Sequence, residues 1–249
     1  MNDQLSWQRL AWVLRVDVMR SGRSALVILG TAAGVALGVS LGGAYDGDVG
    51  QGSTFYRAFF IAALFAWGTI ATSGCFNDMH GRATNTAFLL LPASALEKTL
   101  SRLLIYTVGV IASLLVLTTV LSWLLESINS LWIGERREFF SPFDALAWSL
   151  LPHYLVAQSL LFLGAAWFRK LQYVKTIAAI IAILVGLTAF AVLLAWLLGP
   201  RGTGTGLVID DPIDFTVEVV PWAYYAVLPL LCWFVAWLRV SEAQVSHGV

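Results

Sequence analysis

Three histidines, His80, His153 and His247, are the side chains of this 249-residue chain best suited to acid–base or metal chemistry. They are scattered over different segments, and neither an HExxH motif nor paired-histidine spacing indicates a bound metal or haem. No GxSxG motif or cysteine–histidine arrangement marks a nucleophile. Cys75 and Cys232 fall within or at the end of apolar runs, where they pack as small hydrophobic residues. We therefore predict that the chain is not an enzyme and holds no metal or cofactor.

His153 is the one histidine that could act inside a membrane. It follows Pro152, about two turns into an apolar run. An ionisable group at membrane depth is a candidate functional site. The alternative is a neutral histidine that is hydrogen-bonded within the outer half of a helix bundle.

Nucleotide binding is not expected in this chain. It has no GxxxxGK[ST] loop, and the glycine-rich stretch 202–206 lacks the lysine that a phosphate-binding loop needs. The formal net charge is zero, so the composition gives no indication of a nucleic-acid partner.

The composition is that of an integral membrane protein. Hydrophobic residues make up 59% of the chain and charged residues 12%, against about 25% charged residues in soluble domains. A helix needs about 20 apolar residues to cross a bilayer, and six runs qualify: 24–43, 57–75, 103–124, 146–168, 174–198 and 222–238. Their length and their lack of strand-like alternation predict helices rather than a barrel. We expect an all-α fold with six transmembrane helices in a single domain, 1–249.

Basic residues collect on one side of these six spans. With the N-terminus inside, eleven lysines and arginines lie in inner segments, namely Arg9, Arg15, Arg20, Arg23, Arg82, Lys98, Arg102, Arg169, Lys170, Lys175 and Arg239. Four lie in outer segments, namely Arg57, Arg136, Arg137 and Arg201. The positive-inside bias therefore predicts that both termini are cytoplasmic.

Residues 4–22, ahead of the first span, are predicted to form a helix. Their apolar residues make two stripes on opposite sides, with charged residues between them. This pattern suits a helix that lies in the membrane interface, with one face on lipid and one on the bundle. Arg20-Ser21-Gly22 offers a break before the first span; the alternative is a continuous helical extension of that span.

Gly30, Gly34, Gly38 and Gly42 recur at intervals of four in the first span and so share one helix face. Glycines in this register let another helix approach closely. The stripe could contact a second subunit or a moving helix, or it could pack against a neighbour within the chain.

The segment 77–102 is a polar connection on the predicted inner side. Leu91-Pro92 should divide it into one element at 76–90 and another at 92–124, because proline disfavours helical geometry in the residue before it. Ser94, Glu97, Lys98 and Arg102 would give the second element a polar inner end. The short apolar run 88–91 could face the membrane interface or insert into a groove on a protein.

Leu91-Pro92-Ala93-Ser94, Glu97-Lys98 and Ser101-Arg102 resemble the cytoplasmic segment that follows the second span in permease subunits of bacterial ABC-type exporters of the six-span class. The layout of spans and the N-terminal helix also agree with this family. The resemblance implies a coupling helix that docks on a separate ATPase subunit, with these contact residues: Phe88, Leu89, Leu90, Leu91, Pro92, Ala93, Ser94, Glu97 and Lys98.

The same resemblance implies a dimer of permease subunits in the bacterial cytoplasmic membrane, surrounded by lipid, with ATP and magnesium held by the partner ATPase. Apolar spans favour a hydrophobic or amphipathic substrate. A secondary transporter would usually carry intramembrane carboxylates or broken helical repeats, and we find neither. A non-transporting membrane anchor or immunity protein needs no particular residues and remains an alternative, as does a secondary transporter.

Overall fold

The computed structural model describes residues 6–45, 52–81, 84–133, 138–198 and 221–246. Within these ranges every regular element is a helix. Six helical stretches are long and apolar enough to cross a membrane: Trp7–Ser40, Ser53–His80, Ala95–Leu131, Ala145–Trp167, Gln172–Leu194 and Ala223–Ala243. Each overlaps one of the six predicted runs, so the prediction of an all-α chain with six such helices is confirmed.

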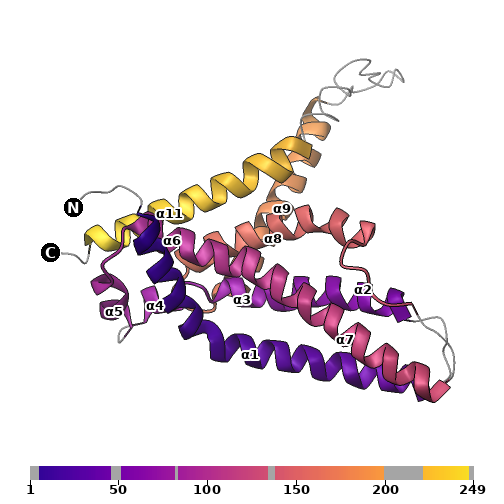
Figure 1. Cartoon of the computed structure of the whole chain (residues 1–249). Helices are drawn as coiled ribbons and strands as arrows, with labels where there is room; N and C mark the ends of the chain where they lie inside the picture. Colours follow the sequence, from indigo (N-terminus) through magenta and orange to yellow (C-terminus); the bar gives the residue numbers. More distant parts are fainter. Residues whose placement is uncertain (1–5, 46–51, 82–83, 134–137, 199–220, 247–249) are drawn as a thin grey trace.

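The first helix, α1 (Trp7–Tyr45), is continuous, so the predicted break at Arg20-Ser21-Gly22 is wrong. One glycine costs a helix about 1 kcal/mol but still donates its backbone N–H, so the ladder of hydrogen bonds is not interrupted. Ser21 Oγ donates to the carbonyl of Asp17 at 2.8 Å, a type of bond that bends helices. α1 bends in its N-terminal part without ending (Figure 1).

The second and third spans are each built from several helical pieces. The second comprises α2 (Gly52–Ala63), η1 (Leu64–Gly68) and α3 (Thr69–Ser73), and α4 (Asn77–His80) follows it. The third comprises α6 (Ala95–Leu104), η2 (Ile105–Gly109) and α7 (Val110–Ile133). The segments η1 and η2 are π-helical turns, which occur mostly as single insertions within α-helices.

The last three spans are α8 (Ala145–Trp167), α9 (Gln172–Leu198), and η3 (Ala223–Val227) with α11 (Leu228–Ser246). The side chain of Asp144 caps α8 by accepting hydrogen bonds from the backbone N–H groups of Leu146 and Ala147. α11 packs along α8, whereas the apolar side chains of α9 between Ile181 and Val192 are exposed.

Two apolar clusters hold the bundle together. One joins α1, α2, η1, α7 and α8 through residues such as Tyr56, Phe60 and Tyr154. The other joins the 75–79 region, α5 (Asn85–Leu90), α8 and α11, and its centre includes Phe76 and Phe162. α4, α5 and the N-terminal part of α1 lie at the same end of the molecule as the C-terminal part of α11 (Figure 1).

Candidate functional site

The segment between the second and third spans is interrupted twice. α5 ends at Leu90 and α6 begins at Ala95, so the chain leaves helical geometry around Leu91-Pro92, as the proline predicts. The expectation of one element over 76–90 is wrong, because α4 and α5 are separate helices. Pro92 also lies in the bend before α6 rather than in its first turn.

A capping box starts α6. Ser94 Oγ accepts a hydrogen bond from the Glu97 backbone N–H at 3.2 Å, and the Glu97 carboxylate accepts one from the Ser94 N–H at 3.0 Å. The two bonds satisfy backbone donors that a helix start would otherwise leave unpaired. Our sequence analysis missed this motif, although the spacing S-x-x-E signals it.

Glu97 also ties α6 to the start of α1. Its buried carboxylate accepts a hydrogen bond from the Ser6 backbone N–H at 2.9 Å and forms an ion pair with Arg9 at 3.1 Å. The same side chain therefore starts one helix and holds the beginning of another.

Lys98 ties α6 to α5. Its Nζ donates to the Phe88 carbonyl at 2.8 Å and lies 4.9 Å from the centre of the Phe88 ring. Both side chains are buried. The last turn of α5 is thus held by a hydrogen bond and a cation–π contact.

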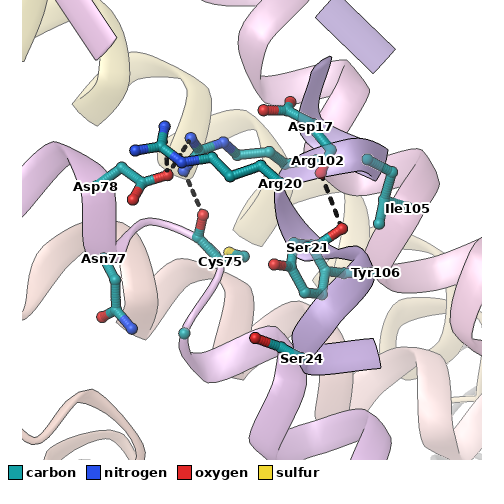
Figure 2. A pocket seen from close by; sticks show the side chains of 11 residues that line it. Asp17, Arg20, Ser21, Ser24, Cys75, Asn77, Asp78, Arg102, Ile105 and Tyr106 are labelled. Atoms are coloured by element: carbon teal, nitrogen blue, oxygen red, sulfur yellow. Dashed lines mark hydrogen bonds and ion pairs between the residues drawn. The ribbon is translucent and has the colours of Figure 1, made fainter. Parts of the chain in front are cut away.

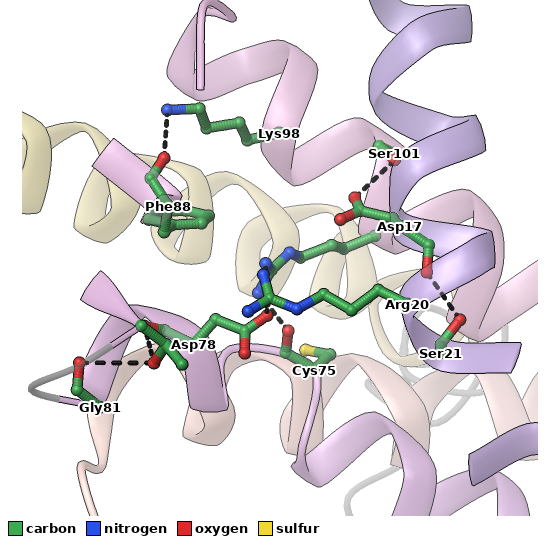
Figure 3. A network of polar contacts seen from close by, with 11 residues as sticks. Asp17, Arg20, Ser21, Cys75, Asp78, Gly81, Phe88, Lys98 and Ser101 are labelled. Atoms are coloured by element: carbon green, nitrogen blue, oxygen red, sulfur yellow. Dashed lines mark hydrogen bonds and ion pairs between the residues drawn. The ribbon is translucent and has the colours of Figure 1, made fainter. Parts of the chain in front are cut away.

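Arg102 and Arg20 converge on one carboxylate (Figure 2), and Figure 3 shows Arg20 beside Asp78 and Lys98 beside Phe88. Arg20 lies 3.1 Å and Arg102 3.4 Å from Asp78 Oδ2. Arg102 also donates to the Cys75 carbonyl, and its guanidinium lies within 5.2 Å of the Phe76 and Phe88 ring centres. Asp78 therefore joins α1, α4 and α6 at one point.

These charges line a polar cavity of about 200 Å³. Figure 2 shows Asp17, Arg20, Asp78 and Arg102 around it. Asp17 in turn accepts a hydrogen bond from Ser101 Oγ at 2.8 Å. Two positive and two negative groups balance within a space smaller than the usual 300–1,000 Å³ of a ligand pocket. The cluster can hold helices together, but it is small for a transported amphipathic molecule.

The predicted coupling residues divide into an outward and an inward set. Leu90 is 77% exposed, and Pro92 beside it is exposed as well. Phe88, Ala93, Glu97 and Lys98 are buried, and Leu91 and Ser94 are half-buried. The Leu89 side chain lies outside the described residues. Among the coupling residues whose side chains the structure describes, Leu90 and Pro92 are the ones exposed to a partner, and the buried residues hold this tip in position.

The glycine stripe faces away from the chain's own bundle. A Cβ built at Gly30, Gly34, Gly38 or Gly42 would meet no atom within 4 Å. Ala32, Ala36 and Ser40 form the buried face of α1 instead. Packing of the stripe against a neighbour within the chain is therefore wrong for the described residues.

His153 of α8 is hydrogen-bonded to a tyrosine at the start of the sixth span. Its Nε2 lies 2.7 Å from the Tyr225 hydroxyl of η3, and both side chains are exposed. Its neighbour Tyr154 is buried, with its hydroxyl 3.5 Å from the Tyr106 carbonyl of η2. The His80 Nε2 lies 3.0 Å from the Ala165 carbonyl, and His247 lies outside the described residues.

No group of three or more potential metal-binding side chains occurs in the part of the chain that the structure describes.

The chain matches no protein-family model, no curated protein and no solved structure.

Proposed function

We propose that this chain is the permease subunit of an ATP-driven exporter of the ABC type. The observation that carries the proposal is an exposed apolar tip, formed by Leu90 and Pro92, on a base of buried charged contacts. An exposed leucine on an otherwise polar connection is suited to a pocket on a soluble partner. ATP and magnesium would be bound by that partner.

The contacts beneath the tip provide a route for motion. A push on α5 would reach α6 through Lys98, and a push on α4 would reach α1 and α6 through Asp78. Movement of these helices would tilt the first and third spans and release a hydrophobic or amphipathic substrate outward by alternating access. A second permease subunit would pack on the outward-facing glycine stripe of α1.

The test is Leu90→Asp. A buried, unpaired charge at an interface anchor costs about 2 kcal/mol or more, which weakens binding about thirtyfold. We expect affinity purification from native membranes to lose a P-loop ATPase that the wild type retains. The matched control is Leu131→Asp at the far end of α7, where the leucine is 85% exposed. Equal ATPase recovery with both variants would refute the proposed docking site.

The predicted topology has a separate test. In a variant lacking Cys75 and Cys232, a cysteine replacing Asp211 should react with an impermeant reagent on intact cells. A cysteine replacing the exposed Thr86 of α5 should react only after the cells are permeabilised. The reverse labelling would put α5 outside, where no cytoplasmic ATPase could reach it. If the topology holds but no ATPase is recovered with the wild type, the membrane-anchor alternative is favoured.

A further inference from the structure

Basic side chains from three elements converge where α8 meets α9 and α11. His80 ends α4, Arg169 lies in the turn after α8, and Arg239 lies on α11. His80 Nε2 lies 3.0 Å from the carbonyl of Ala165 near the end of α8, and the Arg239 guanidinium lies 5.1 Å from the ring centre of Trp167, the last residue of that helix. The end of α8 therefore brings together groups that are far apart in the sequence. Lys170 and Lys175 are exposed on the same turn and at the start of α9.

The positive charge of this basic cluster comes from Arg169, Lys170, Lys175 and Arg239, with His80 beside them, and it has little acidic compensation. Its one ion pair among the described residues joins Arg239 to the exposed Glu242 of the same helix at 2.9 Å. The arginines beside the candidate coupling segment differ, because Arg9, Arg20 and Arg102 are paired with Glu97 or Asp78. The basic cluster therefore presents an excess of positive charge.

Apolar side chains flank the same cations. Trp167 is exposed, and its ring centre lies 5.1 Å from the Arg239 guanidinium. Leu171 is 71% exposed and has a φ of 52°, in the left-handed region that a branched side chain rarely adopts. The backbone thus holds a leucine in a strained conformation, as is common at ligand-binding positions, and leaves its apolar side chain uncovered and able to contact an apolar ligand.

We propose that the basic cluster, with Trp167 and Leu171, binds the headgroup of an anionic phospholipid. The phosphate would lie among the cations, and the acyl chains would cover the two apolar side chains. Basic sites between transmembrane helices on the cytoplasmic side suit anionic headgroups, and tryptophan is enriched at the membrane interface. Free phosphate would use the charges but leave Trp167 and Leu171 uncovered. The site does not depend on the proposed transport function.

The test uses the full chain in detergent with dioleoyl phosphatidylglycerol or dioleoyl phosphatidylcholine, and lipid binding is measured by titration in native mass spectrometry. We expect the wild type to prefer phosphatidylglycerol. Arg169→Gln/Arg239→Gln should weaken that binding by about fivefold for each cation removed. The matched control, Arg15→Gln/Arg23→Gln, removes two exposed arginines from α1 and should change it by less than about twofold.

Equal binding of the two lipids by the wild type would overturn the proposal, and so would equal weakening in the control, which would indicate general attraction to an anionic surface. If inorganic phosphate competes with phosphatidylglycerol as well as the lipid itself does, the site is a simple anion site. Binding of an acidic protein fraction without binding of phosphatidylglycerol would assign the surface to a protein partner and overturn the proposal. Should the double variant lose its helical circular dichroism signal, Arg169→Gln/Lys170→Gln replaces it, because both of those side chains are exposed.

Discussion

Replacing Arg102 or Arg20 by methionine should have unequal effects, although both arginines bind Asp78. The Arg102 side chain is 5% exposed and that of Arg20 is 45% exposed. Arg102→Met loses a charge-assisted hydrogen bond to the Cys75 carbonyl, worth about 1.5–3 kcal/mol. It also loses two cation–π contacts of about 0.5–1 kcal/mol each.

In the Arg102 variant Asp78 keeps Arg20 as a partner and Asp17 keeps its hydrogen bond from Ser101, so neither carboxylate loses every partner. Methionine also fills much of the apolar space. We therefore expect a loss of about 3 kcal/mol in the free energy of unfolding. Arg20→Met removes a half-exposed ion pair and should cost less than about 1 kcal/mol.

The measurement is reversible unfolding in mixed micelles with increasing dodecyl sulfate, followed by tryptophan fluorescence. Hydrogen exchange across residues 76–94 gives a second readout, because Arg102→Met should speed exchange there more than Arg20→Met does. Equal losses in the two variants would refute the conclusion that Arg102 is the buried anchor of α4. A larger loss for Arg20→Met would do so as well.

Two further predictions concern glycines. Gly68→Ala should lower the free energy of unfolding by about 1–3 kcal/mol, because the new Cβ would lie 2.6 Å from the hydroxyl of the buried Tyr154. The control Gly186→Ala, whose Cβ would meet no atom of the described residues within 4 Å, should leave it unchanged or raise it by up to about 1 kcal/mol. Equal thermal unfolding of the two variants would contradict this packing. Gly34→Leu/Gly38→Leu should dissociate a detergent-solubilised dimer, measured by light scattering, and leave the monomer's unfolding temperature unchanged, since a Cβ at either position would meet no atom of the described residues within 4 Å. A retained dimer would remove the stripe from the interface.

The capping box of α6 joins residues that are close in the sequence, whereas the contacts of Glu97 with Ser6 and of Asp78 with Arg20 join residues that are far apart. The capping box joins residues three apart and could form in an isolated peptide. The contact from Ser6 to Glu97 spans 91 residues, and the ion pair of Arg20 with Asp78 joins the first span to the connection after the second. The candidate coupling segment therefore gets its shape locally and its position from contacts with distant parts of the chain.

The sequence by itself determined the features that depend on local physics. Six apolar runs of sufficient length predict six helices, because only helices and closed barrels satisfy their backbone hydrogen bonds within a bilayer, and these runs lack the alternation of barrel strands. Pro92 predicts the interruption after Leu90, because its ring restricts the residue before it. The predicted break at Arg20-Ser21-Gly22 is wrong because a single glycine weakens a helix without removing a backbone hydrogen bond.

Only the tertiary structure decided which way each face points. A spacing of four puts Gly30 to Gly42 on one side of α1, but the neighbouring helices decide that this side faces outward. Glu97, Lys98 and Leu90 are all plausible surface residues in the sequence, yet two are buried and one is exposed. A buried charge needs a partner at close range, and here those partners come from α1 and α5, whose position beside α6 no local pattern records.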